Sequence, residues 1–190
     1  MRLKDLEKRE AIKQATFAVV AEEGVNALKM ADIARRVGVS PSTLYTYFED
    51  KDHLIQSLFR EVLKSMVTVV VQEFRPDRPY KVNLKHFWIA YLHHRIRHHQ
   101  ATLFYERVKA SSYFQKTVAE SKSLEMAIPM QLIRMGQEQL LLKDVAPELI
   151  LATLGGMTDR MTTLFSSGEL PLSDAHVEEC FAMLWDAIKA

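Results

Sequence analysis

Apolar residues recur every three to four positions along most of this chain, which is the spacing of α-helices that bury one face. The longest such run lies in residues 51–74, where Leu54, Leu58 and Val62 mark the buried face. The pattern therefore predicts an all-α fold. Further helices are expected at residues 3–23, 80–99, 101–110, 113–142 (bent at Pro129), 147–166 and from Ser173 onward.

Residues 29–51 predict two short helices that are joined by a tight turn. Gly38 closes the first helix, because glycine tolerates the positive φ that helix ends often require. Ser40 is a suitable N-cap for the second helix, and Pro41 occupies the first helical position, where its missing N–H costs nothing. Two helices joined by a short turn that contains glycine are typical of a helix-turn-helix, here residues 29–48.

The second of these helices separates into a buried and an outward face. Leu44 and Phe48 point the same way and form its buried side. A helix of this kind fits the major groove of DNA and can place its outward side chains on base edges. An ordinary helical hairpin is the alternative interpretation. The outward side chains are all uncharged hydrogen-bonding groups, namely Ser42, Thr43, Tyr45, Thr46 and Tyr47.

The chain beyond the long helix predicts a second, larger helical domain. Two prolines within residues 75–79 interrupt the helical pattern, so we place a domain boundary there. The expected organisation is a three-helix DNA-binding domain at residues 1–50, a connecting helix at 51–74 and a larger domain at 75–190. The last two helices each carry a continuous apolar stripe, which either completes a monomer core or binds a second copy. Gly155 and Gly156 would allow close approach of another helix.

Composition narrows the class of protein further. The formal net charge is +1, so the charge balance of the whole chain identifies no partner. A single cysteine, Cys180, excludes an intramolecular disulfide and fits a reducing compartment. The charged N-terminus predicts no signal peptide, and no apolar run reaches the length of about eighteen residues that a membrane span needs. We therefore predict a cytoplasmic protein that does not enter a membrane.

Chemistry-bearing motifs are scarce in the sequence. His94 and His98 have a spacing that can hold a metal ion, but acidic partners are lacking nearby, so we predict no metal site. The sequence has no glycine-rich phosphate loop, no nucleophile elbow and no CxxC pair. Neither enzymatic activity nor a cofactor is therefore expected. An enzyme and an apolar-ligand carrier without a DNA role remain as alternatives.

The segment GVSPSTLYTYFEDKDHL, preceded by Gly24 and by the pair Ile33 and Ala34, resembles the N-terminal domain of TetR/AcrR-type transcriptional regulators. The resemblance covers about residues 8–60 and implies a homodimeric repressor that binds a pseudo-palindromic operator in double-stranded DNA. Lys29 departs from the threonine that is usual in the family, which caps the helix and meets a phosphate; lysine can still reach a phosphate. The residues expected at the DNA are Lys29, Ser40, Ser42, Thr43, Tyr45, Thr46, Tyr47 and Lys51.

The same resemblance implies a small-molecule effector site and a dimer interface in the second domain. Aromatic and methionine side chains suit an apolar or aromatic ligand, although a helical core is made of the same residues. The helix at residues 51–74 is expected to couple the effector site to the DNA. The expected effector pocket comprises Phe87, Tyr91, Phe104, Tyr105, Met126, Met130 and Met157. The expected dimer interface comprises Leu154, Met161, Val177, Phe181, Leu184 and Ile188.

Overall fold

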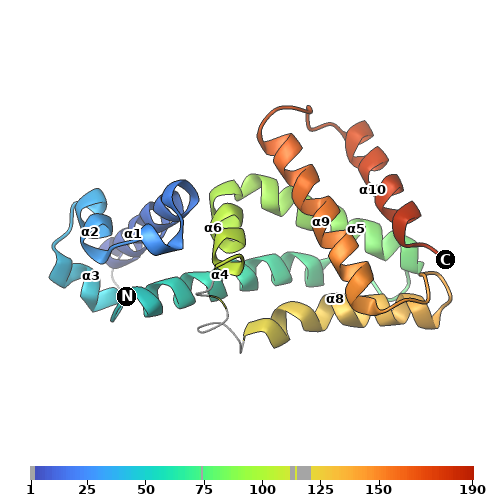
Figure 1. Ribbon diagram of the computed structural model, residues 1–190, viewed down its shortest axis with the longest axis horizontal. Helices are drawn as coiled ribbons and strands as arrows, with labels where there is room; N and C mark the ends of the chain where they lie inside the picture. Colours follow the sequence, from blue (N-terminus) through green and yellow to red (C-terminus); the bar gives the residue numbers. More distant parts are fainter. Residues whose placement is uncertain (1–2, 74, 112–113, 115–120) are drawn as a thin grey trace. The chain divides into compact units, whose positions relative to one another are not determined.

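The structure is a computed structural model that describes residues 3–73, 75–111, 114 and 121–190. Its regular elements are helices, so the all-α prediction is confirmed (Figure 1). A single isolated antiparallel bridge, between Leu142 and Lys189, is recorded among the described residues. The helices are α1 (Leu3–Glu23), η1 (Val25–Ala27, a 3-10 helix), α2 (Met30–Val37), α3 (Pro41–Tyr47), α4 (Lys51–Gln72), α5 (Tyr80–Arg97), α6 (His99–Lys109), α8 (Ser121–Glu138), α9 (Pro147–Ser166) and α10 (Asp174–Ile188).

The helix predicted at residues 113–142 differs from the structure at its C-terminal end. Helix α8 ends at Glu138, and Leu140 has a φ of 58°, a left-handed conformation that stops the helix. Pro129 lies inside α8, as the sequence indicates. The start of the predicted helix falls largely outside the described residues.

The described residues pack as two compact units. Unit 1 takes the chain up to Lys64 and then from His98 to Ser121, and unit 2 takes Ser65 to Arg97 and Lys122 onward. These limits differ from the domain boundary that the prolines indicate, because α6 packs on α1. The Phe104 ring lies 4.9 Å from the Phe17 ring, measured between centroids. Helix α4 contributes its first part to unit 1 and its last part to unit 2.

Unit 1 is built around the apolar faces of α1, α2, α3, α6 and the first part of α4. Charged side chains also join α1 to α4: Glu61 accepts from Lys13 at 2.8 Å and pairs with Arg9 at 3.0 Å. Burial alone would raise the pKa of the Glu61 carboxyl, but the hydrogen bonds and charges of Lys13 and Arg9 together outweigh burial and lower that pKa. The fully buried residues of this unit include Ile12, Val20, Ile33, Leu44, Leu54, Leu58 and Phe59.

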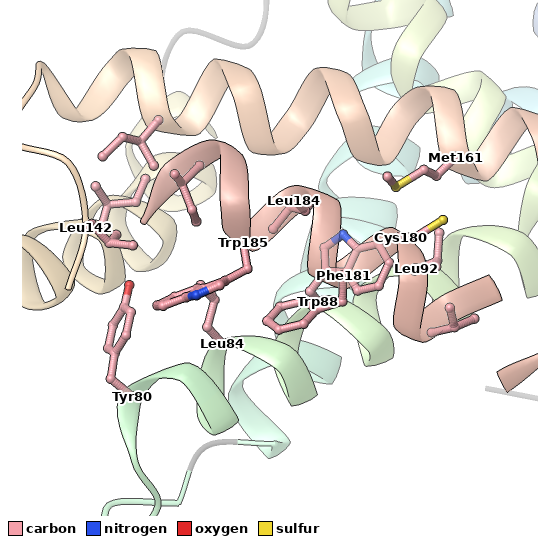
Figure 2. Packing of buried hydrophobic residues seen from close by; sticks show 14 of the residues in the cluster. Tyr80, Leu84, Trp88, Leu92, Leu142, Met161, Cys180, Phe181, Leu184 and Trp185 are labelled. Carbon is pink, nitrogen blue, oxygen red and sulfur yellow. The ribbon is translucent and has the colours of Figure 1, made fainter. Parts of the chain in front are cut away.

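Unit 2 has its core between α5, α9 and α10 (Figure 2). The Trp88 ring lies 5.8 Å from the Phe181 ring, and its indole N–H donates to Thr158 at 2.9 Å. Helix α8 is bonded to this core by Tyr80 of α5. The hydroxyl of Tyr80 donates to the carbonyl of Leu132, on α8, at 3.0 Å. Burial raises the pKa of Tyr80 to about 12, so this phenol remains a donor at neutral pH.

Candidate nucleic-acid interface

The turn between α2 and α3 is fixed by backbone hydrogen bonds at Gly38. Its φ of 72° lies in the left-handed region, which glycine adopts without strain. The N–H of Gly38 donates to Arg35 at 3.2 Å, and the N–H of Val39 donates to Ala34 at 3.0 Å. This pair of bonds is the Schellman motif, which satisfies the last carbonyls of α2 and turns the chain toward α3. The predicted role of Gly38 is thereby confirmed.

The start of α3 is held by the side chain that the sequence indicates. The hydroxyl of Ser40 accepts a hydrogen bond from the backbone N–H of Thr43 at 3.1 Å. The same hydroxyl lies 2.8 Å from that of Ser42 and 2.9 Å from that of Thr43. Three hydroxyl groups therefore gather at the N-terminus of α3, where a helix in a major groove meets the bases.

The two faces of α3 separate as predicted. Leu44 and Phe48 are buried. Tyr45 is 50% exposed, and Thr46 is exposed while its hydroxyl donates to the carbonyl of Thr43. The outward face of α3 thus offers uncharged donors and acceptors on a helix that is anchored from below by two apolar side chains.

Two of the residues expected at the DNA already make hydrogen bonds inside unit 1. The hydroxyl of Tyr47 donates to the carboxylate of Asp5 on α1 at 3.2 Å. The ammonium of Lys51 donates to the carbonyl of Asn26, in η1, at 3.2 Å. Partial desolvation, followed by the charge of Asp5, raises the pKa of Tyr47, whereas desolvation lowers the pKa of Lys51.

Lys29 occupies the N-cap position of α2. Its side chain makes no capping hydrogen bond, as expected for a lysine, and it is exposed. Asp32, in the first turn, pairs with Arg35 at 2.8 Å, and Arg36 pairs with Glu23 at 3.2 Å. The arginines of α2 are therefore partly neutralised by acidic neighbours.

The start of α4 is capped in two directions. The carboxylate of Asp50 accepts from the backbone N–H of His53 at 2.7 Å, so Asp50 is the N-cap residue of this helix. In return, Nδ1 of His53 accepts from the backbone N–H of Glu49 at 3.2 Å. This arrangement differs from a capping box, because the histidine bonds the N–H of Glu49, one residue before the cap, so the standard pattern does not reveal it in the sequence.

The residues predicted to line an effector pocket do not fall in one unit. Phe104 and Tyr105 belong to unit 1, where Tyr105 stacks on Phe59 with centroids 5.0 Å apart. Phe87 is buried in unit 2, whereas Tyr91, Met130 and Met157 are half-buried there. The side chain of Met126 lies outside those that the structure describes. The following residues of the prediction therefore remain together in unit 2: Phe87, Tyr91, Met130 and Met157.

A buried charge, which the sequence pattern did not reveal, lies in the same unit. Arg95 is only 2% exposed. Its guanidinium donates to Asp159 at 2.6 Å, to Tyr91 at 3.0 Å and to Thr162 at 3.3 Å. These bonds join α5 to α9, and one of the partners, Tyr91, is a candidate pocket residue.

The predicted dimer-interface residues face the core of their own chain. The stripes of α9 and α10 pack on each other and on α5, and this packing buries all but one of the six residues. Leu154 is the exception and is partly buried against the same core. Within the single chain these side chains are therefore covered by their own core, and their place in a dimer interface stays a prediction. The buried residues are Met161, Val177, Phe181, Leu184 and Ile188.

Neither a metal site nor a membrane-spanning helix is found among the described residues. Among them, no group of three or more His, Cys, Asp or Glu side chains has the arrangement of a metal site. His94 hydrogen-bonds with Ser65 at 2.8 Å, and His98 is the N-cap residue of α6. Within the same part of the chain, no helix has both the length and the apolar character that crossing a membrane requires.

Comparisons with known proteins agree with this geometry. Residues 12–58, which span α1 to α4, match the bacterial regulatory proteins of the tetR family. An uncharacterized HTH-type transcriptional regulator from Haemophilus influenzae is 28% identical over 88 residues, which cover 46% of this chain and 47% of that protein. The fatty acid metabolism regulator protein of Bacillus subtilis is 30% identical over 81 residues, 40% of this chain and 42% of that protein. These matches span less than half the length of either relative.

Likeness to a solved structure extends over the whole chain. A TetR family transcription regulator from Marinobacter aquaeolei VT8 covers 100% of this chain, and this chain covers 99% of it. The two share 25% sequence identity, with a TM-score of 0.88. The Haemophilus influenzae relative and the Marinobacter aquaeolei structure are both named as transcription regulators. In its helix-turn-helix segment and in its complete fold, this chain is similar to the TetR family of bacterial regulatory proteins.

Proposed function

We propose that the protein is a homodimeric transcriptional repressor that places α3 in the major groove of a pseudo-palindromic operator. The observation that carries the proposal is the outward face of α3. Its uncharged hydrogen-bonding side chains start at a capped N-terminus, and two buried side chains anchor the opposite face. Such a face can read base edges, and Lys29 and Lys51 flank it as phosphate ligands.

The experiment that tests this function is a gel shift with DNA from beside the protein's own gene. Sequence-specific retention that weakens steeply with salt is expected, because phosphate binding releases counterions. Footprinting of the retained DNA is expected to show two related half-sites about one helical turn apart. A carrier of apolar ligands or an enzyme would retain none of these fragments selectively, and that result would contradict the proposal.

Substitutions on α3 and at the start of α4 are expected to have different effects on binding. Thr43→Ala is expected to weaken operator binding by about 1–3 kcal/mol and to leave binding to unrelated DNA nearly unchanged, because only base contacts carry sequence information. Lys51→Ala is expected to weaken both and to reduce the salt slope by about one ion.

The measurement is fluorescence anisotropy on operator and unrelated duplexes over a range of salt concentrations. Lys51→Arg is the matched control, because it retains the charge, and thermal unfolding of each variant checks that loss of the bond to Asn26 leaves unit 1 folded. An altered sequence preference for Lys51→Ala with an unchanged salt slope would show that the two roles are assigned wrongly.

The dimer is proposed to form through the outward positions of α9 and α10. Leu149 on α9 is 61% exposed and Met183 on α10 is 62% exposed, so each of these neighbouring helices presents a large apolar side chain outward. Gly156, also on α9, is exposed. Apart from the backbone of its own helix, no described atom lies within 4 Å of a Cβ built there. A second copy could approach α9 closely at this point.

Met183→Glu is therefore expected to raise the dimer dissociation constant at least about tenfold, because a buried carboxylate would replace an apolar contact. Sedimentation velocity over a dilution series measures the change. Leu172→Glu is the matched control, because Leu172 is equally apolar and 48% exposed but lies between the two helices. Equal effects of the two substitutions would place the interface elsewhere.

Unit 2 is proposed to hold an apolar or aromatic effector near Phe87, Tyr91, Met130 and Met157. The mixture of aromatic and thioether side chains supports this, and so does a relative that is named for fatty acid metabolism. Helix α4 contributes to both units and is the element that would carry a change between them.

Thermodynamic linkage makes the effects of effector and operator on each other's binding equal. If the effector releases the operator, the operator must weaken effector binding by the same factor, typically about 5- to 150-fold. A fatty acid of medium chain length is the probe, and calorimetry with and without saturating operator is the measurement. Equal heats and affinities in both titrations would show that this ligand does not regulate DNA binding.

A further inference from the structure

The hydroxyl of Tyr47 is committed to a partner before any DNA is present. It donates to the carboxylate of Asp5 at 3.2 Å, across 42 positions in the sequence, and so joins the end of α3 to the first turn of α1. Tyr47 and Asp5 are both half-buried, and both lie in unit 1. This contact adjoins the exposed face of α3.

A phenol has one O–H donor, and this fact makes the contact exclusive. While the hydroxyl of Tyr47 donates to Asp5, it can present only lone pairs to a second anion. A phosphate oxygen is itself an acceptor, so the two groups cannot share the same proton. Lys51 differs in this respect, because an ammonium has three donors and can bind the carbonyl of Asn26 and a phosphate together.

The charge of Asp5 acts in the same direction. A carboxylate within hydrogen-bond distance of the Tyr47 hydroxyl lies close to any phosphate that this hydroxyl would bind, and like charges at such a distance repel. Both effects oppose the transfer of the Tyr47 hydroxyl from the protein to DNA. The raised pKa of Tyr47 is consistent with a phenol that remains protonated as a donor to Asp5.

We propose that Asp5 is an autoinhibitory residue that holds the Tyr47 hydroxyl and must release it before Tyr47 can bind a DNA phosphate. The inference rests on the proposed DNA-binding function and adds a residue of α1 that weakens binding. Because the phosphate is the same in every sequence, Asp5 lowers affinity for all DNA alike and leaves sequence preference unchanged. Asp5 is a positioning residue, since it acts through Tyr47.

The test uses the full-length protein and a fluorescein-labelled duplex of mixed sequence, about 40 base pairs long, which accommodates two half-sites. No operator is needed, because a phosphate contact is made on any sequence. Asp5→Asn is expected to bind this duplex about three- to fivefold more tightly than the unsubstituted protein, a gain typical of removing one partly exposed charge interaction. In the Tyr47→Phe background, Asp5→Asn is expected to raise affinity by less than about half of that three- to fivefold gain.

Glu7→Gln is the matched control for charge. Glu7 lies two positions further along α1, so it points to another side of the helix, and its substitution removes the same charge. It is expected to increase affinity less than Asp5→Asn, and equally in both backgrounds. Ring carbon-13 labelling of tyrosine gives a readout without DNA: Asp5→Asn is expected to lower the pKa of Tyr47, whose signal is identified by its loss in Tyr47→Phe.

The outcomes separate the inference from the function on which it rests. If Asp5→Asn and Glu7→Gln raise affinity equally, or if the gain persists in the Tyr47→Phe background, Asp5 does not act through Tyr47 and the inference fails. The proposed function would stand in that case, because the unsubstituted protein binds DNA. Absence of binding by the unsubstituted protein at low salt would overturn both.

Discussion

Replacing Asp159 with alanine is expected to lower the free energy of unfolding of unit 2 by about 3 kcal/mol. The substitution leaves the guanidinium of Arg95 buried without the carboxylate to which it donates at 2.6 Å. An uncompensated buried charge is among the most costly defects in a protein core. Tyr91 and Thr162 would still accept hydrogen bonds from Arg95 but would not balance its charge.

Substitution of the other partner of this ion pair, Arg95, provides the control. Arg95→Met is expected to cost less than Asp159→Ala, because the side chain of Asp159 is 48% exposed and water can solvate it. Denaturant unfolding followed by tryptophan fluorescence measures both, since the two tryptophans of the chain, Trp88 and Trp185, lie in the core of unit 2. A larger loss for Arg95→Met would mean that packing of the arginine stem, and not its charge, dominates.

Gly136→Ala is expected to destabilise the same unit by about 2 kcal/mol, although alanine is the better helix former by about 1 kcal/mol. A Cβ at this position would lie 2.5 Å from the ring and hydroxyl of Tyr80 and 2.8 Å from Leu142. Tyr80 cannot move aside cheaply, because it is buried and its hydroxyl donates to the carbonyl of Leu132. The steric cost therefore outweighs the gain in helix propensity.

Gly155→Ala is the matched comparison for this prediction. Gly155 also lies inside a helix, but no atom of the described chain comes within 4 Å of a Cβ built there. Its substitution is expected to stabilise the chain by up to about 1 kcal/mol. In the Tyr80→Leu background, Gly136→Ala is expected to lose most of its cost, and an unchanged cost there would contradict the assigned clash.

Local features of the interface could be predicted from the sequence because their causes are local. The caps at Ser40 and Asp50, the left-handed turn at Gly38 and the buried side of α3 all follow from neighbouring residues. Apolar periodicity likewise locates most helices within a few residues of their observed ends. These parts depend on no contact that is distant in sequence.

Contacts between distant residues were not predictable by the same reasoning. An apolar stripe shows that a helix face is covered but not what covers it, so the sequence could not show that the stripes of α9 and α10 pack within the chain. Phe104 reads equally well as a pocket residue or as the neighbour of Phe17. Asp5 and Tyr47 carry no joint signal, because one hydrogen bond across 42 positions leaves no periodic trace.

The packing of α6 against α1 has a consequence for the order in which the chain can fold during synthesis. Unit 1 is discontinuous in sequence. Helix α5 is made after the helix-turn-helix and before α6, which completes the core of unit 1. At about 5–20 residues per second, the ribosome adds α6 several seconds after α3. Phe17 and Phe59 therefore wait without their aromatic partners while α5 emerges. A fragment cut at the end of α4 would remain in that unfinished state, so isolated expression of the helix-turn-helix should extend through Lys109 or supply α6 in trans.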